Sequence, residues 1–361
     1  MTSSRPLTRA LAPLLAASLL AGGCSDVGDA PTAPPPPEEG HEGKYTLLAL
    51  ATPDGSGQTV HPDHVEVNGP WLGVDQYLVA NPYRNGDARL ENPSLYAGPG
   101  GHGWSAPPGL TNPVVRPAGG YLSDPDMLFV PELGQLWIYY RQVTSRNEIW
   151  LVTSSDGVHF SAPRSVLSAP NHDIVSPAVV RRASDDWLMW SVNSNVGCTA
   201  SSTTVELRRS RDGVEFGPPS TVALAQAGWS VWHIEVQWIE SRHEYWAVYN
   251  VKTAGSCTTP AVYLATSPDG VAWHTFPSPL IQRGATDALR DVVYRTTFAY
   301  DAATEKIRFW YSGAKFDGGA YVWRTVFQER DRAEVFATIE TPSAKTRAAP
   351  ASTTPPLLEG P

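Results

Sequence analysis

The sequence predicts an all-β protein, a five-bladed β-propeller of four-stranded blades. Two observations lead to this prediction. A turn signature recurs at a nearly constant spacing, and a pair of short, aromatic-rich apolar runs precedes each clear copy of it. No long stretch shows the helical periodicity of apolar residues that would indicate another class of fold.

The turn signature reads Ser-x-Asp-Gly-x-x-aromatic. Its three clear copies end at Phe160, Phe216 and Trp273, which are 56 and 57 positions apart, and a degenerate copy ends 56 positions earlier at Trp104. In such a turn the Asp caps backbone N–H groups, the Gly supplies a positive φ, and the aromatic residue packs between blades.

A repeat of about 56 residues that holds four short strands has the size of a propeller blade. The apolar runs are rich in β-branched and aromatic residues and are bounded by Gly, Asp or Asn, so they are typical of strands. Residues 60–338 accommodate five such units. A structural turn is needed in every blade, whereas a catalytic group is needed only once in the protein. We therefore interpret the signature carboxylates as structural: Asp156, Asp212 and Asp269.

The composition agrees with a folded β protein. Apolar residues make up 42% of the 361 residues and charged residues only 17%, which excludes a disordered chain or a coiled coil. The net charge of −9 argues against a nucleic-acid partner, because such a protein would carry a basic stripe.

The N-terminus predicts export. Arg5 and Arg9 precede an apolar stretch at 11–21 and small residues before Cys24, the pattern of a signal peptide. The segment resembles a bacterial lipoprotein signal, and the resemblance implies that Cys24 is lipidated and anchors the chain to the cell envelope, on its periplasmic side or at the cell surface. An ordinary cleaved signal is the alternative. No later run approaches the roughly 20 apolar residues that span a bilayer, so membrane contact is expected through the anchor alone.

The expected organisation follows from these boundaries. Residues 1–23 form the signal peptide, 24–44 a Pro-rich linker, 45–338 the propeller, and 339–361 a disordered tail. A tethered, closed propeller is expected to be a monomer.

Two further cysteines, Cys198 and Cys257, fall in matching loops of neighbouring repeats. In an oxidising compartment such a pair favours a disulfide, with two free thiols as the alternative. No Cys/His pattern has metal-ligand spacing, so neither a metal site nor a cofactor is predicted. A structural Ca²⁺ in the channel is compatible with the sequence but not demanded by it.

Candidate site residues come from the start of each repeat, where the innermost strand would line the central channel. Three of these starts contain an X-Pro step, which predicts an extended backbone. Strand alternation places His233 and Glu235 on one side, and likewise Asp124 and Asp126. Carboxylates, His and Arg among aromatic residues suit a sugar ligand. The candidates for substrate binding are Asp126, His233, Arg295, His61, Glu91, Trp232 and Tyr294.

Glycoside hydrolysis requires two carboxyl groups, one of them an acid with a raised pKa. Our candidates are Glu235 as the acid, because its apolar neighbours favour a raised pKa, and Asp124 as the base or nucleophile.

The layout resembles the clan of propeller glycoside hydrolases that includes families 32 and 43. Ser123–Phe129 followed by Leu136–Arg141 is similar to their blade-opening Asp-Pro strand and the Tyr-rich strand after it. In family 43 a base Asp, a second Asp and an acid Glu come from consecutive blades. Here the third repeat has Ser176-Pro177-Ala178 at the matching place, and only Asp173 could replace the middle Asp.

Three functions fit the sequence. The first is a glycoside hydrolase that cleaves an extracellular poly- or oligosaccharide. The second is a non-catalytic carbohydrate-binding propeller, and the third is a scaffold for a protein partner. The sequence favours the first of these.

Overall fold

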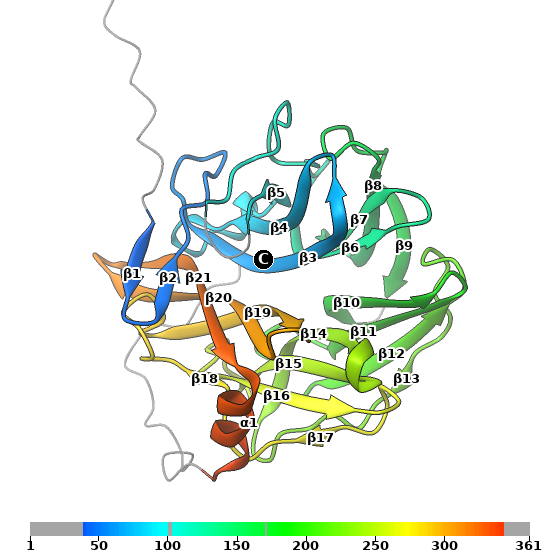
Figure 1. Cartoon of the computed structure of the whole chain (residues 1–361). Coiled ribbons are helices and arrows are strands. Elements are labelled where there is room, and N and C mark those ends of the chain that lie inside the picture. The colour runs from blue at the N-terminus through cyan, green and yellow to red at the C-terminus, as the bar shows by residue number, and fades with distance from the viewer. Residues whose placement is uncertain (1–38, 100–102, 170–171, 343–361) are drawn as a thin grey trace, which may run out of the picture. The chain divides into compact units, whose positions relative to one another are not determined.

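A computed structural model describes residues 39–99, 103–169 and 172–342. Over these residues, five antiparallel sheets surround a common axis (Figure 1). The first strand of each sheet contacts the first strand of the next, and the ring closes between the fifth sheet and the first. The predicted five-bladed propeller is confirmed, with three to five strands per sheet rather than four in each.

The first three blades follow the chain from the axis outward. Blade one contains β3 (Thr59–Trp71), β4 (Val74–Pro82) and β5 (Ser94–Ala97). Blade two contains β6 (Tyr121–Val130), β7 (Gln135–Val143), β8 (Asn147–Ser154) and β9 (Arg164–Ala169). Blade three contains β10 (Asp173–Ala183), β11 (Asp186–Ser194), β12 (Thr204–Ser210) and β13 (Ser220–Thr221).

The last two blades complete the ring. Blade four contains β14 (Ser230–Ile239), β15 (Glu244–Lys252), β16 (Ala261–Ser267), β17 (His274–Thr275) and β18 (Ile281–Gln282). Blade five contains β19 (Val292–Asp301), β20 (Lys306–Asp317), β21 (Ala320–Asp331), β2 (Tyr45–Leu47) and β1 (Gly40–Glu42). The helices of the described residues are the short 3-10 turns η1 (Arg84–Gly86), η2 (Ala88–Leu90) and η3 (Glu240–Arg242), and α1 (Arg332–Glu340).

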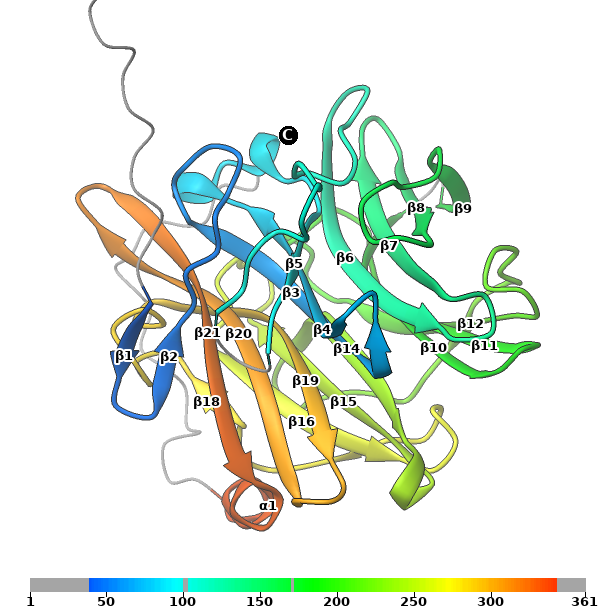
Figure 2. The same ribbon diagram turned by 45° about the horizontal axis from the view of Figure 1, so that its top comes forward.

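Blade five takes its outer strands from the beginning of the described chain. Thr46 pairs with Phe327 and Leu47 with Val326, so β2 extends the sheet beyond β21. Figure 2 shows α1 directly after β21. Two boundaries therefore differ from the sequence prediction: β1 lies inside the expected linker 24–44, and α1 runs past residue 338. The expected signal peptide, Cys24 and most of the expected tail lie outside the described residues.

The Asp-Gly turns have the predicted structural role. Asp156 Oδ1 accepts hydrogen bonds from the backbone N–H groups of Val158 and His159, at 2.9 and 2.7 Å, and Gly157 has a φ of 68°. The other two copies repeat this geometry. The turns also join neighbouring blades, because the Tyr139 hydroxyl donates to the carbonyl of Gly213, and the Trp190 indole donates to that of Gly270.

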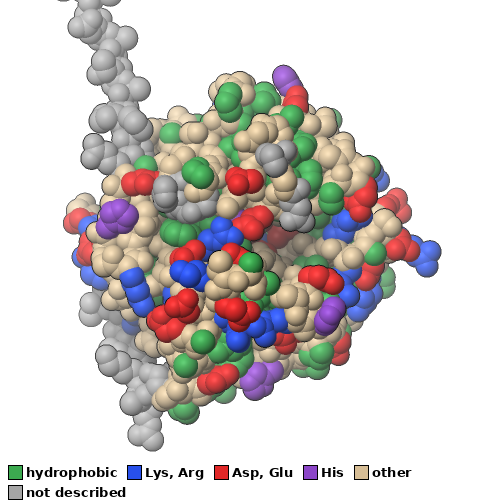
Figure 3. Space-filling view, in the orientation of Figure 1, with side chains coloured by type: hydrophobic (Ala, Val, Ile, Leu, Met, Phe, Trp, Pro, Cys, Tyr) green, Lys and Arg blue, Asp and Glu red, His purple; other side chains and the backbone are tan. Residues whose placement is uncertain are grey.

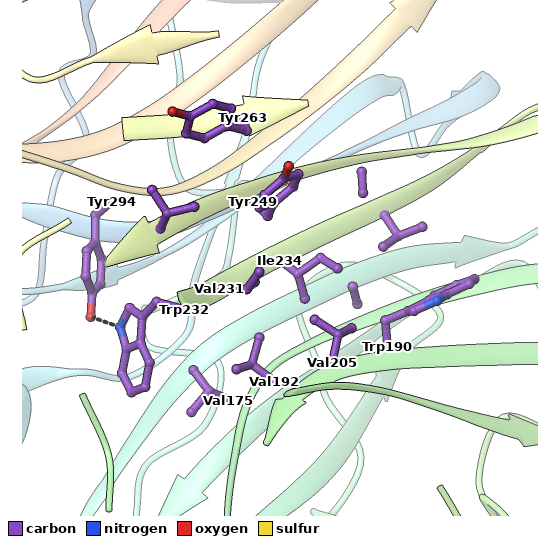
Figure 4. Close-up of a cluster of buried hydrophobic side chains, with 14 of the residues drawn as sticks. Val175, Trp190, Val192, Val205, Val231, Trp232, Ile234, Tyr249, Tyr263 and Tyr294 are labelled. Atoms are coloured by element: carbon purple, nitrogen blue, oxygen red, sulfur yellow. Dashed lines mark hydrogen bonds between the residues drawn. The ribbon is translucent and has the colours of Figure 1, made fainter. Parts of the chain in front are cut away.

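The hydrophobic core lies between the blades. Its largest members are fully buried tryptophans, and Figure 4 shows one such cluster, in which Trp232 and Tyr294 point toward each other. On the surface seen in Figure 3, Lys and Arg side chains are interspersed with Asp and Glu. Within the described part of the chain, no helix is both long and apolar enough to cross a membrane.

The predicted disulfide is confirmed. Cys198 and Cys257 are bonded, with their Cα atoms 4.8 Å apart. The bond joins the loop after β11 in blade three to the loop after β15 in blade four.

Each innermost strand contains an irregularity at the equivalent position, where the pairing register shifts. In three blades the shifted residue precedes a proline and is left-handed: φ is 53° at His61, 50° at Asp124 and 51° at Ser176. The expectation that X-Pro imposes an extended backbone there is wrong. Proline donates no N–H to a ladder and is tolerated at bulges, and the bulge turns the preceding side chain toward the channel axis.

Candidate active site

Two polar clusters lie around the channel axis. The histidine cluster consists of His61, Asp124 and Ser176, from the bulges of β3, β6 and β10, and His233, which directly follows the irregularity in β14. Two residues further along the strands, a second set forms the carboxylate cluster: Asp63, Asp126, Glu235 and, from β19, Arg295. Both sets are buried.

The histidine cluster centres on one oxygen. Asp124 Oδ1 lies 3.3 Å from His61 Nε2 and 3.3 Å from His233 Nδ1. The other oxygen of Asp124 accepts from Arg141 Nη1 and from the backbone N–H of Ser176, each at 3.3 Å. Asp124 is therefore contacted by groups from four blades, with one oxygen directed at the two imidazoles.

Both imidazoles are oriented through Nδ1. His61 Nδ1 lies 3.0 Å from Glu91 Oε2, and His233 Nδ1 lies 2.5 Å from Ser176 Oγ. Among the described residues, Nε2 of His233 has no hydrogen-bond partner, and Nε2 of His61 faces only the Asp124 carboxylate, 3.3 Å away. Glu91 is itself fixed, since Oε2 also accepts from the Ser123 hydroxyl at 2.7 Å.

The protonation states suit a ligand set. Burial lowers the pKa of His233 to about 3, so this ring is neutral at pH 7 and can offer a lone pair. Burial alone would raise the pKa of Asp124, but His61, His233 and Arg141 hold it well below its usual range. Asp124 is therefore a carboxylate at neutral pH.

These residues fit a divalent cation. His61, Asp124 and His233 each offer one ligand atom, and the three atoms lie within 4.8 Å of one another. Two imidazoles and a carboxylate form a common catalytic ligand set that leaves open positions. Each ligand also has the outer partner that such sites require: Glu91, Ser176 and Arg141. The ligands come from three blades, so no local spacing in the sequence could have indicated them.

The carboxylate cluster is held by backbone and side-chain donors. Asp63 accepts from the backbone N–H of Met127 and from the Thr297 hydroxyl, at 2.5 and 2.8 Å. Arg295 Nη2 donates to Glu235 Oε2 at 3.1 Å and lies 3.9 Å from Asp126.

The three carboxyl groups of this cluster have raised pKa values. Burial raises the pKa of Asp63, Asp126 and Glu235, and the mutual repulsion of these groups raises those of Asp126 and Glu235 further. They line a pocket of about 310 Å³ that continues along the inner strands past Gln237 and Tyr300.

The predicted catalytic pair is divided between the two clusters. Asp124 belongs to the histidine cluster, and Glu235 lies with Asp63, Asp126 and Arg295. Within the carboxylate cluster, the oxygens lie within 4.8 Å of one another. That spacing is below the roughly 6.5–9.5 Å between the carboxyl groups of an inverting glycosidase and near the roughly 5–5.5 Å of a retaining one.

The remaining predicted residues are placed as follows. Glu91 contacts His61, and Arg295 and Asp126 lie in the carboxylate cluster. Trp232 is 0% exposed and belongs to the hydrophobic core. Its indole N–H donates to the Tyr294 hydroxyl at 3.0 Å, which does not favour direct stacking of Trp232 on a sugar (Figure 4).

The sequence predicts that Ser176 faces the common axis, but Ser176, Asp63 and Arg141 were not among the candidates for catalysis or substrate binding. Asp63 had a signal in the sequence: it stands two positions after His61, as Asp126 does after Asp124. Arg141 looks like an ordinary strand residue and gave no signal.

Comparisons with known proteins agree with this architecture. No family model matches the chain. An A type blood N-acetyl-alpha-D-galactosamine deacetylase of Flavonifractor plautii is 27% identical over 312 residues, which are 72% of this chain and 40% of that protein. The chain thus matches less than half the length of this relative.

Solved structures share the fold. An N-acetylgalactosamine deacetylase from F. plautii, in complex with blood group B trisaccharide, superposes with a TM-score of 0.70 and 24% identity, over 78% of this chain and 92% of that one. A thermostable family-43 glycoside hydrolase superposes with a TM-score of 0.54 and 11% identity, over 81% and 97%. Penicillium chrysogenum alpha-L-arabinanase superposes with a TM-score of 0.53 and 12% identity, over 82% of this chain and 99% of that one.

The shared fold is that of carbohydrate-active propellers. The resemblance to the propeller glycoside hydrolases that the sequence indicated is therefore confirmed for the fold. These similar proteins act on different bonds, so the reaction must be argued from the site.

Proposed function

We propose that this chain is a hydrolase that removes the acetyl group from an N-acetylated amino sugar of a glycan, using a divalent cation held by His61, Asp124 and His233. The observation that supports it is the histidine cluster: two imidazoles and one carboxylate converge on one point, each with an outer partner. The similarity to the F. plautii deacetylase supports the choice of bond.

A cation bound there would supply Lewis-acid chemistry, polarising the acetamide carbonyl and acidifying the attacking water. The protein's residues do the rest. Glu91 and Ser176 contact Nδ1 of the two imidazoles and fix the orientation of both rings. Arg141 donates to Asp124 and orients it, and His61, His233 and Arg141 together keep the pKa of Asp124 low. Water adds to the acyl carbon, the C–N bond breaks, and acetate and the free amino sugar leave after a proton reaches the nitrogen.

The experiment measures acetate released from the blood group A trisaccharide. We expect release that a chelator abolishes and added divalent cation restores. His233→Ala should lose more than the roughly 10- to 100-fold that loss of an outer partner costs. His274→Ala, an exposed histidine on β17, is the matched control and should retain full activity. A folded protein that releases no acetate under any of these conditions would contradict the proposal.

A glycoside hydrolase remains the second candidate, because one observation favours it. Glu235 has a pKa well above its usual range, mainly through burial, whereas Asp124 has one well below it, the division of roles that acid and base require. Release of a monosaccharide that Glu235→Gln abolishes would support this function over deacetylation.

Export and anchoring are a separate proposal, which rests on the sequence of residues 1–24. In the producing bacterium, we expect the wild-type chain in the membrane fraction and Cys24→Ser in a soluble fraction. Equal distribution of the two would contradict lipidation of Cys24.

A further inference from the structure

We propose that a pocket on the outer side of blade five binds an oxyanion, the carboxylate or sulfate group of an acidic sugar. The pocket has a volume of about 450 Å³ and is lined by residues of β2, β18, β21 and α1 and of the segment around β18. It contains no residue of the histidine cluster or the carboxylate cluster. It is therefore a second site, separate from the candidate active site.

The charges that line this pocket favour an anion. Lys44, Arg283 and Arg330 contribute three cations, and Glu334 is the one acid among the twelve lining residues. Glu334 lies 3.3 Å from Arg330 Nη2 and 3.8 Å from Lys44 Nζ. One carboxylate thus faces three cations, which leaves an excess of positive charge over the pocket.

Arg330 has a donor that the protein does not use. Its side chain is 92% or more buried, a rare state for an arginine. Nη2 donates to Glu334 and to the Thr338 hydroxyl, but among the described residues Nε has no acceptor. Because Nε is enclosed, Arg330 contributes its charge to the pocket, and the exposed Lys44 and half-buried Arg283 are the donors within reach of a ligand.

The size and the lining of the pocket indicate which kind of molecule bears the anionic group. A volume of about 450 Å³ exceeds that of an inorganic anion and lies in the range of small-molecule sites. Tyr45, Leu280 and Ile281 add apolar surface beside the cations, and aromatic and apolar faces suit the C–H surface of a sugar ring. The assignment of the anion to a sugar rests on the proposed function. The cationic character of the pocket is independent of that function, because it follows from the lining residues.

The test is calorimetric titration of the full chain with glucuronate and N-acetylgalactosamine 6-sulfate, and with galactose and inorganic sulfate as comparison ligands. We expect both acidic sugars to bind and galactose to bind at least tenfold more weakly. The surface variants Arg283→Gln and Lys44→Gln should each weaken binding about two- to fivefold, the value of a partly exposed charge. Arg209→Gln, an exposed arginine on β12, should leave binding unchanged.

The outcomes separate this inference from the proposed function, because acetate release is measured independently. Loss of acidic-sugar binding in the Arg283→Gln, Lys44→Gln double variant, with acetate release unchanged, supports a distinct site. Inorganic sulfate that binds as tightly as the sulfated sugar would overturn the assignment to a sugar. Acidic sugars that bind equally well to the double variant would overturn the site itself.

Discussion

Ser176 Oγ lies 2.5 Å from Nδ1 of His233, although the two residues come from neighbouring blades and are 57 positions apart. The contact depends on an unfavourable backbone conformation, since Ser176 is left-handed and precedes Pro177. Strain of this kind tends to gather at functional sites, where the surrounding structure enforces it.

Ser176 therefore gives a pair of variants that separate strain from function. Ser176→Ala keeps the left-handed strain, whereas Ser176→Gly relieves it, so we expect the Gly variant to be more stable than the Ala variant by about 1 kcal/mol. Both lose the hydroxyl that contacts His233 Nδ1, and acetate release should fall about 10- to 100-fold in both. Chemical denaturation and the acetate assay measure the two quantities. If activity followed stability across the pair, Ser176 would have a purely structural role.

The Asp-Gly turns predict a graded effect of one substitution. A Cβ added to Gly270 would lie 2.5 Å from Trp190, whereas at Gly157 the nearest atom would be 3.5 Å away, and both residues have positive φ. We expect Gly157→Ala to cost about 1 kcal/mol of unfolding free energy through its backbone alone, and Gly270→Ala clearly more, through the added clash. Equal losses would show that Trp190 moves aside freely.

The carboxylate cluster predicts how stability depends on pH. Its carboxyl groups have raised pKa values in the folded chain, so between the unfolded value near 4 and the folded values the native state holds more protons. Their contribution is fully present below the unfolded pKa and is lost as pH rises through the folded pKa.

The variant that tests this is Asp126→Asn, which cannot ionise. Between about pH 5 and pH 8, we expect the wild-type unfolding free energy to decline more steeply than that of Asp126→Asn, by up to about 1.4 kcal/mol per pH unit. Asp185→Asn, at an exposed position, should keep the wild-type slope. Parallel slopes for wild type and Asp126→Asn would contradict the raised pKa.

The disulfide is expected to stabilise the chain by restricting its unfolded state. Cys198 and Cys257 are 59 positions apart, and closing a loop of this length typically adds about 2–4 kcal/mol. The Cys198→Ser, Cys257→Ser double variant should lose that amount, and a reductant should destabilise the wild type but not the variant. A reductant effect on the double variant would point to another cause.

The fold was predictable because one blade-sized unit recurs in the sequence. Asp212-Gly213 and Asp269-Gly270 show the period directly, and the same turns connect neighbouring blades through Tyr139 and Trp190. The closure of blade five was not predictable. Tyr45–Leu47 is a three-residue strand, too short to show an alternating pattern, and it pairs with β21 at the opposite end of the chain.

The site was predictable only in part. Polar residues at strand starts identified Asp124, His233 and Glu235, but alternation treats positions two apart as equivalent. Residues two apart also differ in position along the strand by about 6.6 Å, and this displacement divides His233 from Glu235 and Asp124 from Asp126 between the two clusters. His61, Asp124 and His233 are 63 and 109 positions apart, so only the closed ring of blades brings the three ligands together.

The most direct test of the central claim is to identify the product formed from an oligosaccharide with a terminal N-acetylgalactosamine, by mass spectrometry, in the presence of divalent cation. We predict the intact oligosaccharide carrying a free amine, with acetate released in equal amount, and neither product from His61→Ala. A shortened oligosaccharide that retains its acetyl group would contradict deacetylation. It would instead support glycoside hydrolysis with Glu235 as the acid.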